Sequence, residues 1–326
     1  MLAYIVRRLM YTVPIVCGVL LVTFVIFNLV PGDISRELAG KNASQETVAE
    51  IRAELGMDKP KFVNIQGMED DGVLSVFDSQ FFNHFKNALV FDFGRSLKSK
   101  ENVSDLILRG AGPSLRLTIP IFIALLCSSL TISLLVAFMR GKAFDHIVLF
   151  LCVTGLSLPY LAIILFGQYF LAFKLQWFPI SGYEPGWSGA KYVVLPAIIG
   201  VLAGLGGDVR FYRTVMLDEM KADYVRTAYA KGVATRRVLF VHVLKNAMIP
   251  VITRVVLAIP FLFLGSLLLE RFFGIPGLGY LMIEAIGGRD FPVISGLTFI
   301  ISILFVVGNL ATDICYALVD PRISLK

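Results

Sequence analysis

Long apolar runs separated by short polar segments dominate the chain. Six of the runs hold about 20 or more mainly apolar residues, the length that an α-helix needs to cross the hydrocarbon of a membrane. They are Leu9–Val30, Leu115–Met139, Ile147–Phe173, Val193–Met216, Met248–Leu269 and Phe291–Leu318. Prolines inside the runs, such as Pro159, fit membrane helices because neighbouring groups can satisfy the freed backbone atoms. The pattern predicts an all-α polytopic membrane protein with six transmembrane helices.

Composition agrees with this prediction, because 56% of the 326 residues are hydrophobic, 17% are charged and the mean hydropathy is +0.76. Such values exclude an ordinary soluble domain. The first run follows Arg7 and Arg8, as the apolar core of a secretory signal would. It is too long for such a core, and no small-residue cleavage site follows it. We therefore expect it to be retained as the first span.

The distribution of Lys and Arg sets the orientation, since short cytoplasmic loops carry an excess of them. With the N-terminus inside, the inside segments hold fourteen basic residues, and the two short outside loops hold four. The outside four are Lys174, Lys191, Arg271 and Arg289. The net charge of +6 is therefore explained by topology, and a nucleic-acid partner is not expected. Both termini are predicted to be cytoplasmic.

This topology divides the chain into a first helix (1–30), an extracytoplasmic segment (31–114) and a core of five spans (115–326). In the outer segment, Ser44 is the expected N-cap of a short helix that runs to Leu55 and is closed by Gly56. An acidic turn with glycine follows at residues 69–72. The segment holds too few apolar residues for an independent domain, so we expect a small cap.

The longest inside loop, residues 217–247, divides into two helical stretches around Gly232. The expected stretches are Asp223–Lys231 and Thr235–Asn246, with Thr235 as N-cap of the second. In the second stretch one stripe holds Val238, Val241, His242 and Lys245, with Leu239 and Val243 beside it. A helix–Gly–helix elbow of this kind forms a compact knob that a cytoplasmic partner could grip.

The elbow resembles the conserved cytoplasmic loop of binding-protein-dependent ABC importer permeases, in the oligopeptide, dipeptide and nickel branch. The resemblance rests on Arg226-Thr-Ala-Tyr-Ala-Lys-Gly232, with Asp223-Tyr-Val before it and Arg236-Arg237 and Asn246-Ala-Met-Ile-Pro250 after it. It extends over nearly the whole chain. The further matching segments are Ile5-Val-Arg-Arg8, Val30-Pro-Gly-Asp33, Phe91-Asp-Phe-Gly94 with Ser96, Pro113-Ser-Leu-Arg-Leu117, Glu270-Arg-Phe-Phe-Gly-Ile-Pro-Gly-Leu-Gly279 and Val319-Asp-Pro-Arg322.

The resemblance implies an inner-membrane permease subunit with the type I importer fold. It also implies a homologous second permease subunit, two cytoplasmic ATPase subunits and an extracytoplasmic solute-binding protein. ATP and Mg²⁺ would be used by the ATPase subunits, and this chain would bind no cofactor. The implied cargo is a short peptide, with nickel or another small solute as the alternative. The implied ATPase-docking residues are Asp223, Tyr224, Arg226, Thr227, Ala228, Lys231, Gly232, Arg236 and Arg237.

Enzyme functions lack the residues that they need. The sequence has no GxxxxGK[ST] phosphate loop, so any ATP hydrolysis belongs to another subunit. The three histidines, His84, His146 and His242, have no metal-ligand spacing, and the four cysteines lie in apolar runs. We expect no catalytic residue and no metal site. The residues that bind the substrate cannot be assigned from the sequence.

An ion-coupled secondary transporter is the alternative of a different class. It would favour acidic residues at the centres of spans, or inverted repeats, and the centres of these runs hold no Asp or Glu. Asp208 and Arg210 lie near the inside end of the fourth run. At that depth they face protein, a water-filled cavity or lipid headgroups.

Overall fold

The computed structural model describes residues 2–29, 35–36, 44–54, 57–64 and 77–319. Every regular element of these residues is a helix, apart from one bridge between Arg95 and Asn102. The chain divides into two compact units. Unit 1 comprises Met1–Arg109 and Met282–Val306, and unit 2 comprises Gly110–Leu281 and Val307–Lys326.

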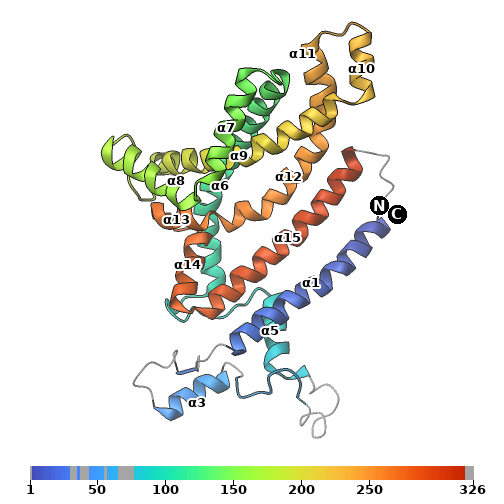
Figure 1. The fold of residues 1–326 in the computed structure, drawn as a ribbon. Helices are drawn as coiled ribbons and strands as arrows, with labels where there is room; N and C mark the ends of the chain where they lie inside the picture. Colours follow the sequence, from blue (N-terminus) through green and yellow to red (C-terminus); the bar gives the residue numbers. More distant parts are fainter. Residues whose placement is uncertain (1, 30–34, 37–43, 55–56, 65–76, 320–326) are drawn as a thin grey trace. The chain divides into compact units, whose positions relative to one another are not determined.

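Five long helices follow the predicted spans (Figure 1). They are α1 (Leu2–Leu29), α6 (Val103–Phe138), α9 (Ala190–Met220), α12 (Leu244–Leu264) and α15 (Phe291–Val319). Four helical stretches of the described residues are long and apolar enough to cross a membrane, and a bent helix pair raises the number to five. In α1 the strongly apolar part of the described residues is Val13–Val25, which is shorter than these four stretches. The predicted six spans are compatible with these helices.

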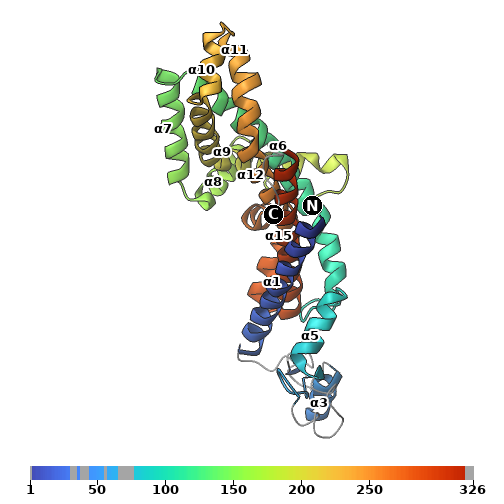
Figure 2. The ribbon, with the colours of Figure 1, turned by 90° about the vertical axis from the view of Figure 1, so that its right-hand side faces the viewer.

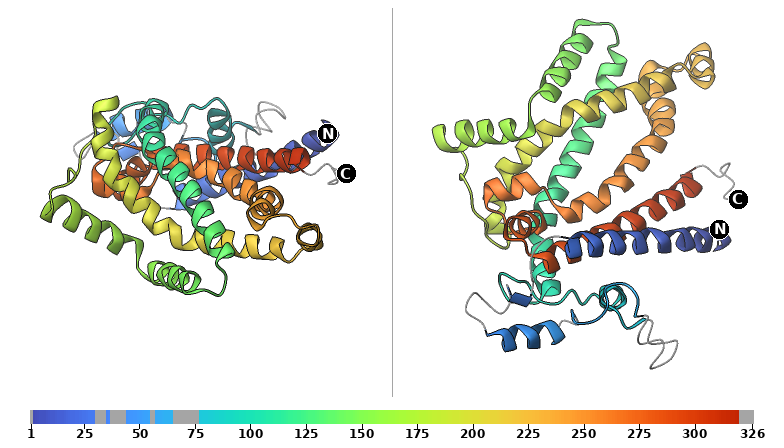
Figure 3. Two further views of the ribbon diagram at one scale, coloured as in Figure 1. Left: turned by 90° about the horizontal axis from the view of Figure 1, so that it is seen from above. Right: turned by 60° about the horizontal axis from the view of Figure 1, so that its bottom comes forward.

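The third predicted span, Ile147–Phe173, is not one straight helix. The helix α7 (Ala143–Ser157) ends before Pro159, and the chain continues as α8 (Tyr160–Gly167) and the π-helical segment η2 (Gln168–Lys174) after a bend of 98°. Figure 3 shows α8 leaving α7 at a steep angle. The cause is local, because proline excludes the helical conformation for the residue before it, and Leu158 has a ψ angle of 130°.

The fifth predicted span also differs from the expected Met248–Leu269. A helical stretch runs without a long break from Thr235 to Phe273, so the second half of the elbow is continuous with the span. It contains α11 (Thr235–Arg237), the π-helical η4 (Val238–Val243), α12 and α13 (Leu267–Phe273). Between α12 and α13 the backbone turns at Gly265, which has a φ angle of 76°.

Unit 1 contains the described part of the predicted outer cap as far as Arg109. The helix α3 (Gln45–Glu54) begins after Ser44, whose Oγ accepts the backbone N–H of Thr47 at 3.2 Å, so the predicted N-cap is confirmed. The expected end at Leu55 and Gly56 and the turn at 69–72 lie outside the described residues. The helix α5 (Gln80–Leu89) packs on α1, with a small core of Leu20, Ala88 and Phe299.

Helix α6 begins at Val103, before the predicted start of the second span at Leu115. Asp290 lies at the start of α15 in unit 1 and fixes the loop that precedes α6. Its carboxylate accepts hydrogen bonds from Ser96 Oγ at 2.5 Å and from the backbone N–H of Leu97 at 3.0 Å. The expected matching segment around Phe91 to Ser96 is thus part of a hydrogen-bonded loop.

Two buried apolar clusters lie among the described residues of unit 2. One contains Leu117 of α6, Leu195 and Ile199 of α9 and Phe273 of α13. The short 3₁₀ turn η3 (Trp187–Gly189) leads into α9, and α14 (Leu278–Gly288) begins in this unit. The second cluster lies beneath the elbow and is described with it below.

Candidate functional site

The predicted elbow is present as two helical segments that fold back on each other (Figure 2). Helix α9 ends at Met220, and α10 (Asp223–Ala230) starts after a turn through Lys221 and Ala222. The next segment is α11 followed by η4, which packs against α10. Ala234, and not the predicted Thr235, is the N-cap of α11, and no side chain caps this helix. The predicted cap is wrong because Thr235 is itself the first residue of the helix.

Gly232 makes the reversal between the two segments possible. Its φ angle is 74°, in the left-handed region that residues with a Cβ rarely adopt. The N–H of Gly232 donates to Tyr229 O at 2.9 Å, and the N–H of Val233 donates to Ala228 O at 3.1 Å. This pair of bonds is the Schellman arrangement at a helix C-terminus. A Cβ on Gly232 would meet nothing within 4 Å, so the backbone conformation alone requires glycine here.

A buried apolar core holds the elbow together. Val225 and Ala228 of α10 pack with Val238, Leu239 and Val243 of the second segment. Leu134 and Ala137 of α6 and Met216 of α9 complete the cluster from below. The elbow is therefore a folded knob anchored on two long helices and does not need a partner to supply its core.

The buried face of the second segment combines Val238 of the stripe with Leu239 and Val243, the two residues beside it. Val238, Leu239 and Val243 are buried, whereas Val241 and Lys245 are exposed. Leu239, Val243 and Ala247 recur every four residues and are all buried, so this face follows the helical period.

Most of the predicted docking residues lie on the surface of the elbow. Asp223, Arg226, Thr227, Lys231, Gly232, Arg236 and Arg237 are exposed, and Tyr224 is half-buried. Ala228 is buried in the elbow core, at 6% exposure, so its side chain supports the knob and does not form its surface. The structure thus brings the predicted basic residues together on a single exposed element.

The exposed charges differ in how they are paired. Arg226 lies 3.5 Å from the carboxylate of Asp223, one helical turn away on α10. Within the described part of the chain no carboxylate pairs with Arg236 or Arg237. These two arginines line a surface cavity of about 410 Å³ together with Ala234 and Phe240. Phe240 is 53% exposed, and the sequence did not single it out because its neighbours Leu239 and Val241 are apolar as well.

Tyr224 ties the base of the elbow to the end of α9. Its hydroxyl donates to Glu219 Oε2 at 2.5 Å. Burial of the ring, together with this carboxylate neighbour, raises the pKa of Tyr224 to about 12. The tyrosine is consequently neutral at any physiological pH and acts as a hydrogen-bond donor.

Two ion pairs fasten α9 to its neighbours near the elbow. Arg213 of α9 binds the buried Asp145 of α7, and Arg254 of α12 lies 2.5 Å from Asp208. The sequence left the surroundings of Asp208 open, and the structure places it against protein. Neither Asp145 nor Arg254 stood out in the sequence, because a single charge near the end of an apolar run reveals no partner.

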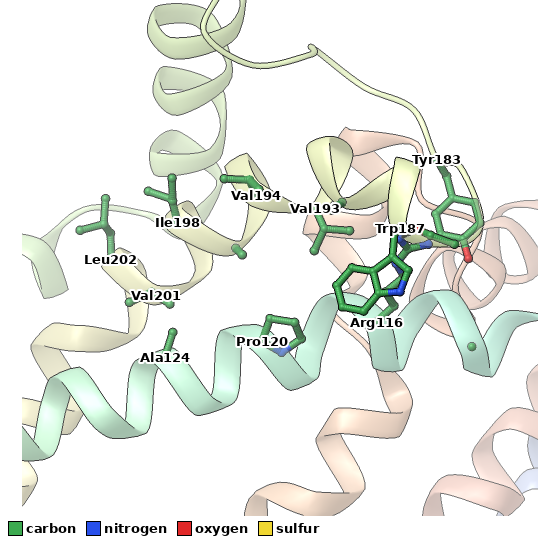
Figure 4. A pocket seen from close by; sticks show the side chains of 14 residues that line it. Arg116, Pro120, Ala124, Tyr183, Trp187, Val193, Val194, Ile198, Val201 and Leu202 are labelled. Carbon is green, nitrogen blue, oxygen red and sulfur yellow. Dashed lines mark hydrogen bonds between the residues drawn. The ribbon is translucent and has the colours of Figure 1, made fainter.

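An apolar groove of about 970 Å³ lies in unit 2 between α6 and α9 (Figure 4). Pro120, Val194, Ile198 and Leu202 are among the side chains that line it. Arg116 stands at one end of the groove and donates to the backbone carbonyls of Glu184 and Gly186. The side chains along the rest of the groove are mainly apolar, so it provides an apolar contact surface.

Among the described residues no group of three or more His, Cys, Asp and Glu side chains could hold a metal ion. The features of this part of the chain are long apolar helices, an anchored elbow and exposed basic residues on its surface. They define a polytopic membrane protein with an anchored, basic elbow.

Comparison with known proteins gives the family. Residues 129–325 match the family described as binding-protein-dependent transport system inner membrane component, and residues 1–118 match its N-terminal family. A putative peptide transport system permease protein of Brucella abortus is 35% identical over 335 residues, covering 99% of both chains. The glutathione transport system permease protein GsiC of Salmonella choleraesuis is 33% identical over 326 residues and the whole of both chains.

The chain therefore belongs to the inner-membrane components of binding-protein-dependent transport systems, as the sequence resemblance indicated. Family membership confirms the predicted class, a membrane permease of an ABC importer.

Proposed function

We propose that this chain is one of two permease subunits of an ATP-driven importer of short peptides, and that its elbow receives the movement of a cytoplasmic ATPase. The observation that carries the proposal is the elbow itself. It is a knob with its own buried core, it exposes Arg236 and Arg237 without an acidic partner among the described residues, and it continues directly into the fifth span.

A surface of this kind suits docking to another protein. Exposed arginines beside the exposed ring of Phe240 combine charge with apolar area, and Arg and aromatic residues are enriched where interfaces bind most strongly. The proposed docking set is the one implied by the sequence, without the side chain of Ala228 and with Phe240 added. ATP and Mg²⁺ bind to the ATPase subunits, and this chain binds neither.

The proposed cargo follows from the relatives, of which one is named for peptides and another for glutathione, itself a small peptide. Nickel remains the alternative that the branch implies. In the proposed topology both termini and the elbow are cytoplasmic, and a binding protein delivers the cargo to the outer side. Substrate passes between this chain and the homologous permease, and closure of the ATPase pair drives the change of access.

The test is to purify the tagged chain with its chromosomal neighbours, reconstitute the complex and measure ATPase activity and peptide uptake. Charge reversal at Arg236 and Arg237 should uncouple ATP hydrolysis from uptake and leave membrane insertion intact. Charge reversal at Arg140 and Lys142 is the matched control, since these are exposed basic residues of another inside turn. Nickel uptake by the same complex, measured with and without competing peptide, separates the two cargoes.

Two results would overturn the proposal. The first is an absence of any associated ATPase together with uptake that a protonophore abolishes and ATP depletion does not, which would indicate an ion-coupled transporter. The second is normal uptake by the Arg236 and Arg237 variant, which would remove these residues from the docking set.

A further inference from the structure

Glu270 is a carboxylate in the interior of unit 2 with no exposed surface. It lies on α13, just past the break at Gly265. Its Oε1 accepts the hydroxyl of Ser114 at 2.7 Å, and its Oε2 accepts the backbone N–H of Tyr280 at 3.0 Å. A buried carboxylate is costly unless such donors surround it, so this arrangement serves a purpose beyond filling space.

The donors come from three separate elements. Ser114 belongs to α6, and its Oγ accepts the N–H of Leu278 at 2.7 Å while its hydroxyl binds Glu270. Tyr280 lies in the first turn of α14, where unpaired N–H groups and the helix dipole favour an anion. The backbone of Ser266, at the break itself, also bonds the Glu270 carboxylate. One side chain therefore joins α6, the α12–α13 break and the start of α14.

The backbone packs closely around this carboxylate. A Cβ on Gly265 would lie 1.9 Å from Oε1, and one on Gly277 would lie 2.4 Å from Oε2. Gly265 also has a φ angle of 76°, so it combines a left-handed turn with direct contact to the carboxylate. The glycines and the glutamate thus form one close-packed joint.

The joint lies at the far end of the helix that leaves the elbow. The stretch from Thr235 to Phe273 carries the chain from α11 through η4 and α12 to α13, and the Glu270 joint holds its last part. The elbow core and the hydrogen bond from Thr118 Oγ1 to Leu262 O already link this stretch to α6, whereas a displacement passed along α12 reaches α13 and α14 only if the turn at Gly265 is rigid. A free glycine turn would absorb such a displacement.

We propose that Glu270 is a positioning residue for transport, because its carboxylate locks the break of the fifth span to α6 and α14 and so transmits the movement of the elbow. The inference rests on the proposed function, in which the elbow receives that movement. Glu270 contacts neither cargo nor nucleotide in this role. Its loss should disconnect ATP hydrolysis from transport without loss of the assembled complex.

The experiment uses the complete transporter, with its ATPase subunits and binding protein, in lipid vesicles. Glu270→Gln retains the size of the side chain but turns an amide N–H₂ toward one set of donors. The variant complex should still assemble. Loaded binding protein should stimulate its ATPase activity at least about fivefold less than it stimulates the unaltered complex, and uptake should fall to match. Glu284→Gln on α14 is the matched control, since its carboxylate is only half-buried, and it should behave as the unaltered complex.

A second readout follows the joint directly. Spin labels at Phe261 and Arg271 flank the break on exposed positions, in a chain with its native cysteines replaced. The distance distribution between the labels should be narrow with Glu270 and broad with Glu270→Gln. If Glu270→Gln prevents assembly, Ser114→Ala takes its place, because it removes one donor and keeps the carboxylate.

The outcomes separate the two proposals. Normal coupling and an unchanged distance distribution in the assembled Glu270→Gln or Ser114→Ala complex would overturn this inference and leave the proposed function standing. An unaltered chain that associates with no ATPase would overturn the proposed function itself. Lost coupling with a broadened distribution supports the positioning role.

Discussion

Arg213 of α9 binds the carboxylate of Asp145 of α7 through a bidentate ion pair. Its Nε donates to Oδ1 at 2.9 Å and its Nη2 donates to Oδ2 at 2.8 Å, and the backbone N–H of Gly141 donates to Oδ2 at 3.0 Å. The Asp145 side chain is 3% exposed. Planar bidentate pairs of this kind fix the relative position of two helices more strictly than a single bond.

Removal of one partner should be costly. We expect Asp145→Ala to destabilise the protein by about 3–5 kcal/mol, because it leaves the guanidinium of a buried pair without its anion. Thermal unfolding in detergent, followed by the loss of monodisperse protein on size exclusion, measures the effect. Asp218→Ala is the control, since its pair with Lys221 is exposed on both sides and such pairs contribute about 0–1 kcal/mol. Equal losses in the two variants would contradict the prediction.

Replacement of Gly232 should strain the elbow through its backbone alone. Gly232→Ala is expected to cost about 1–2 kcal/mol, the usual penalty of a left-handed residue with a Cβ, and to reduce coupling. Gly232→Asn should be milder, because asparagine tolerates this conformation. Hydrogen exchange of the amides in α10 and η4 reports the local loosening. Gly155→Ala in α7 is the control, as a Cβ there also meets nothing within 4 Å but the residue is helical.

The contribution of Tyr224 to the stability of the elbow should be lost in strong alkali. Its pKa in the folded protein is raised from 10.0 to about 12, so the folded state prefers the neutral phenol more than the unfolded chain does. The contribution is therefore complete below pH 10 and is lost as the pH rises toward 12. Ultraviolet titration of tyrosinate, with Tyr224→Phe subtracted, should show one late-ionising phenol. Tyr229→Phe, which alters an exposed ring of the same helix, is the control, and a late phase lost there instead would refute the assignment.

The loop before α6 should depend on Asp290 in unit 1. Asp290→Ala removes the acceptor of Ser96 and Leu97, and the lost bonds of a buried carboxylate correspond to about 1–3 kcal/mol. Amide exchange in residues 96–102 should accelerate, while exchange in α5 should not change. Asp92→Ala serves as the control, because that carboxylate is exposed and accepts one N–H, from Gly94. Unchanged exchange at residues 96–102 in Asp290→Ala would show that the loop is held by other contacts.

The sequence predicted the helical class, the positions of the apolar runs and the elbow, because these depend on local composition and on a glycine at a helix end. It predicted Gly232 and the exposed arginines correctly as parts of one element. The span broken at Pro159 was predicted as continuous because hydropathy records length and not direction. The sequence placed Leu239 and Val243 side by side but did not indicate which face of η4 is buried, because that depends on packing against α6 and α10.

Tertiary pairings were beyond the reach of the sequence. Asp145 with Arg213, and Glu270 with Ser114, join residues that lie far apart along the chain, so neither partner identifies the other. Ala228 was correctly placed in the elbow, but its side chain lies in the elbow core and not on the exposed surface.

The elbow core has a consequence for how the importer assembles. Because Val225, Leu239 and Val243 are already packed, the proposed docking would not require the backbone of the elbow to fold on binding. Under the proposed function, binding energy at the exposed arginines would then be available to distinguish one state of the ATPase partner from another. A peptide cut from residues 217–247 would lack the support of α6 and α9, and it should compete poorly with the intact subunit for the proposed ATPase partner.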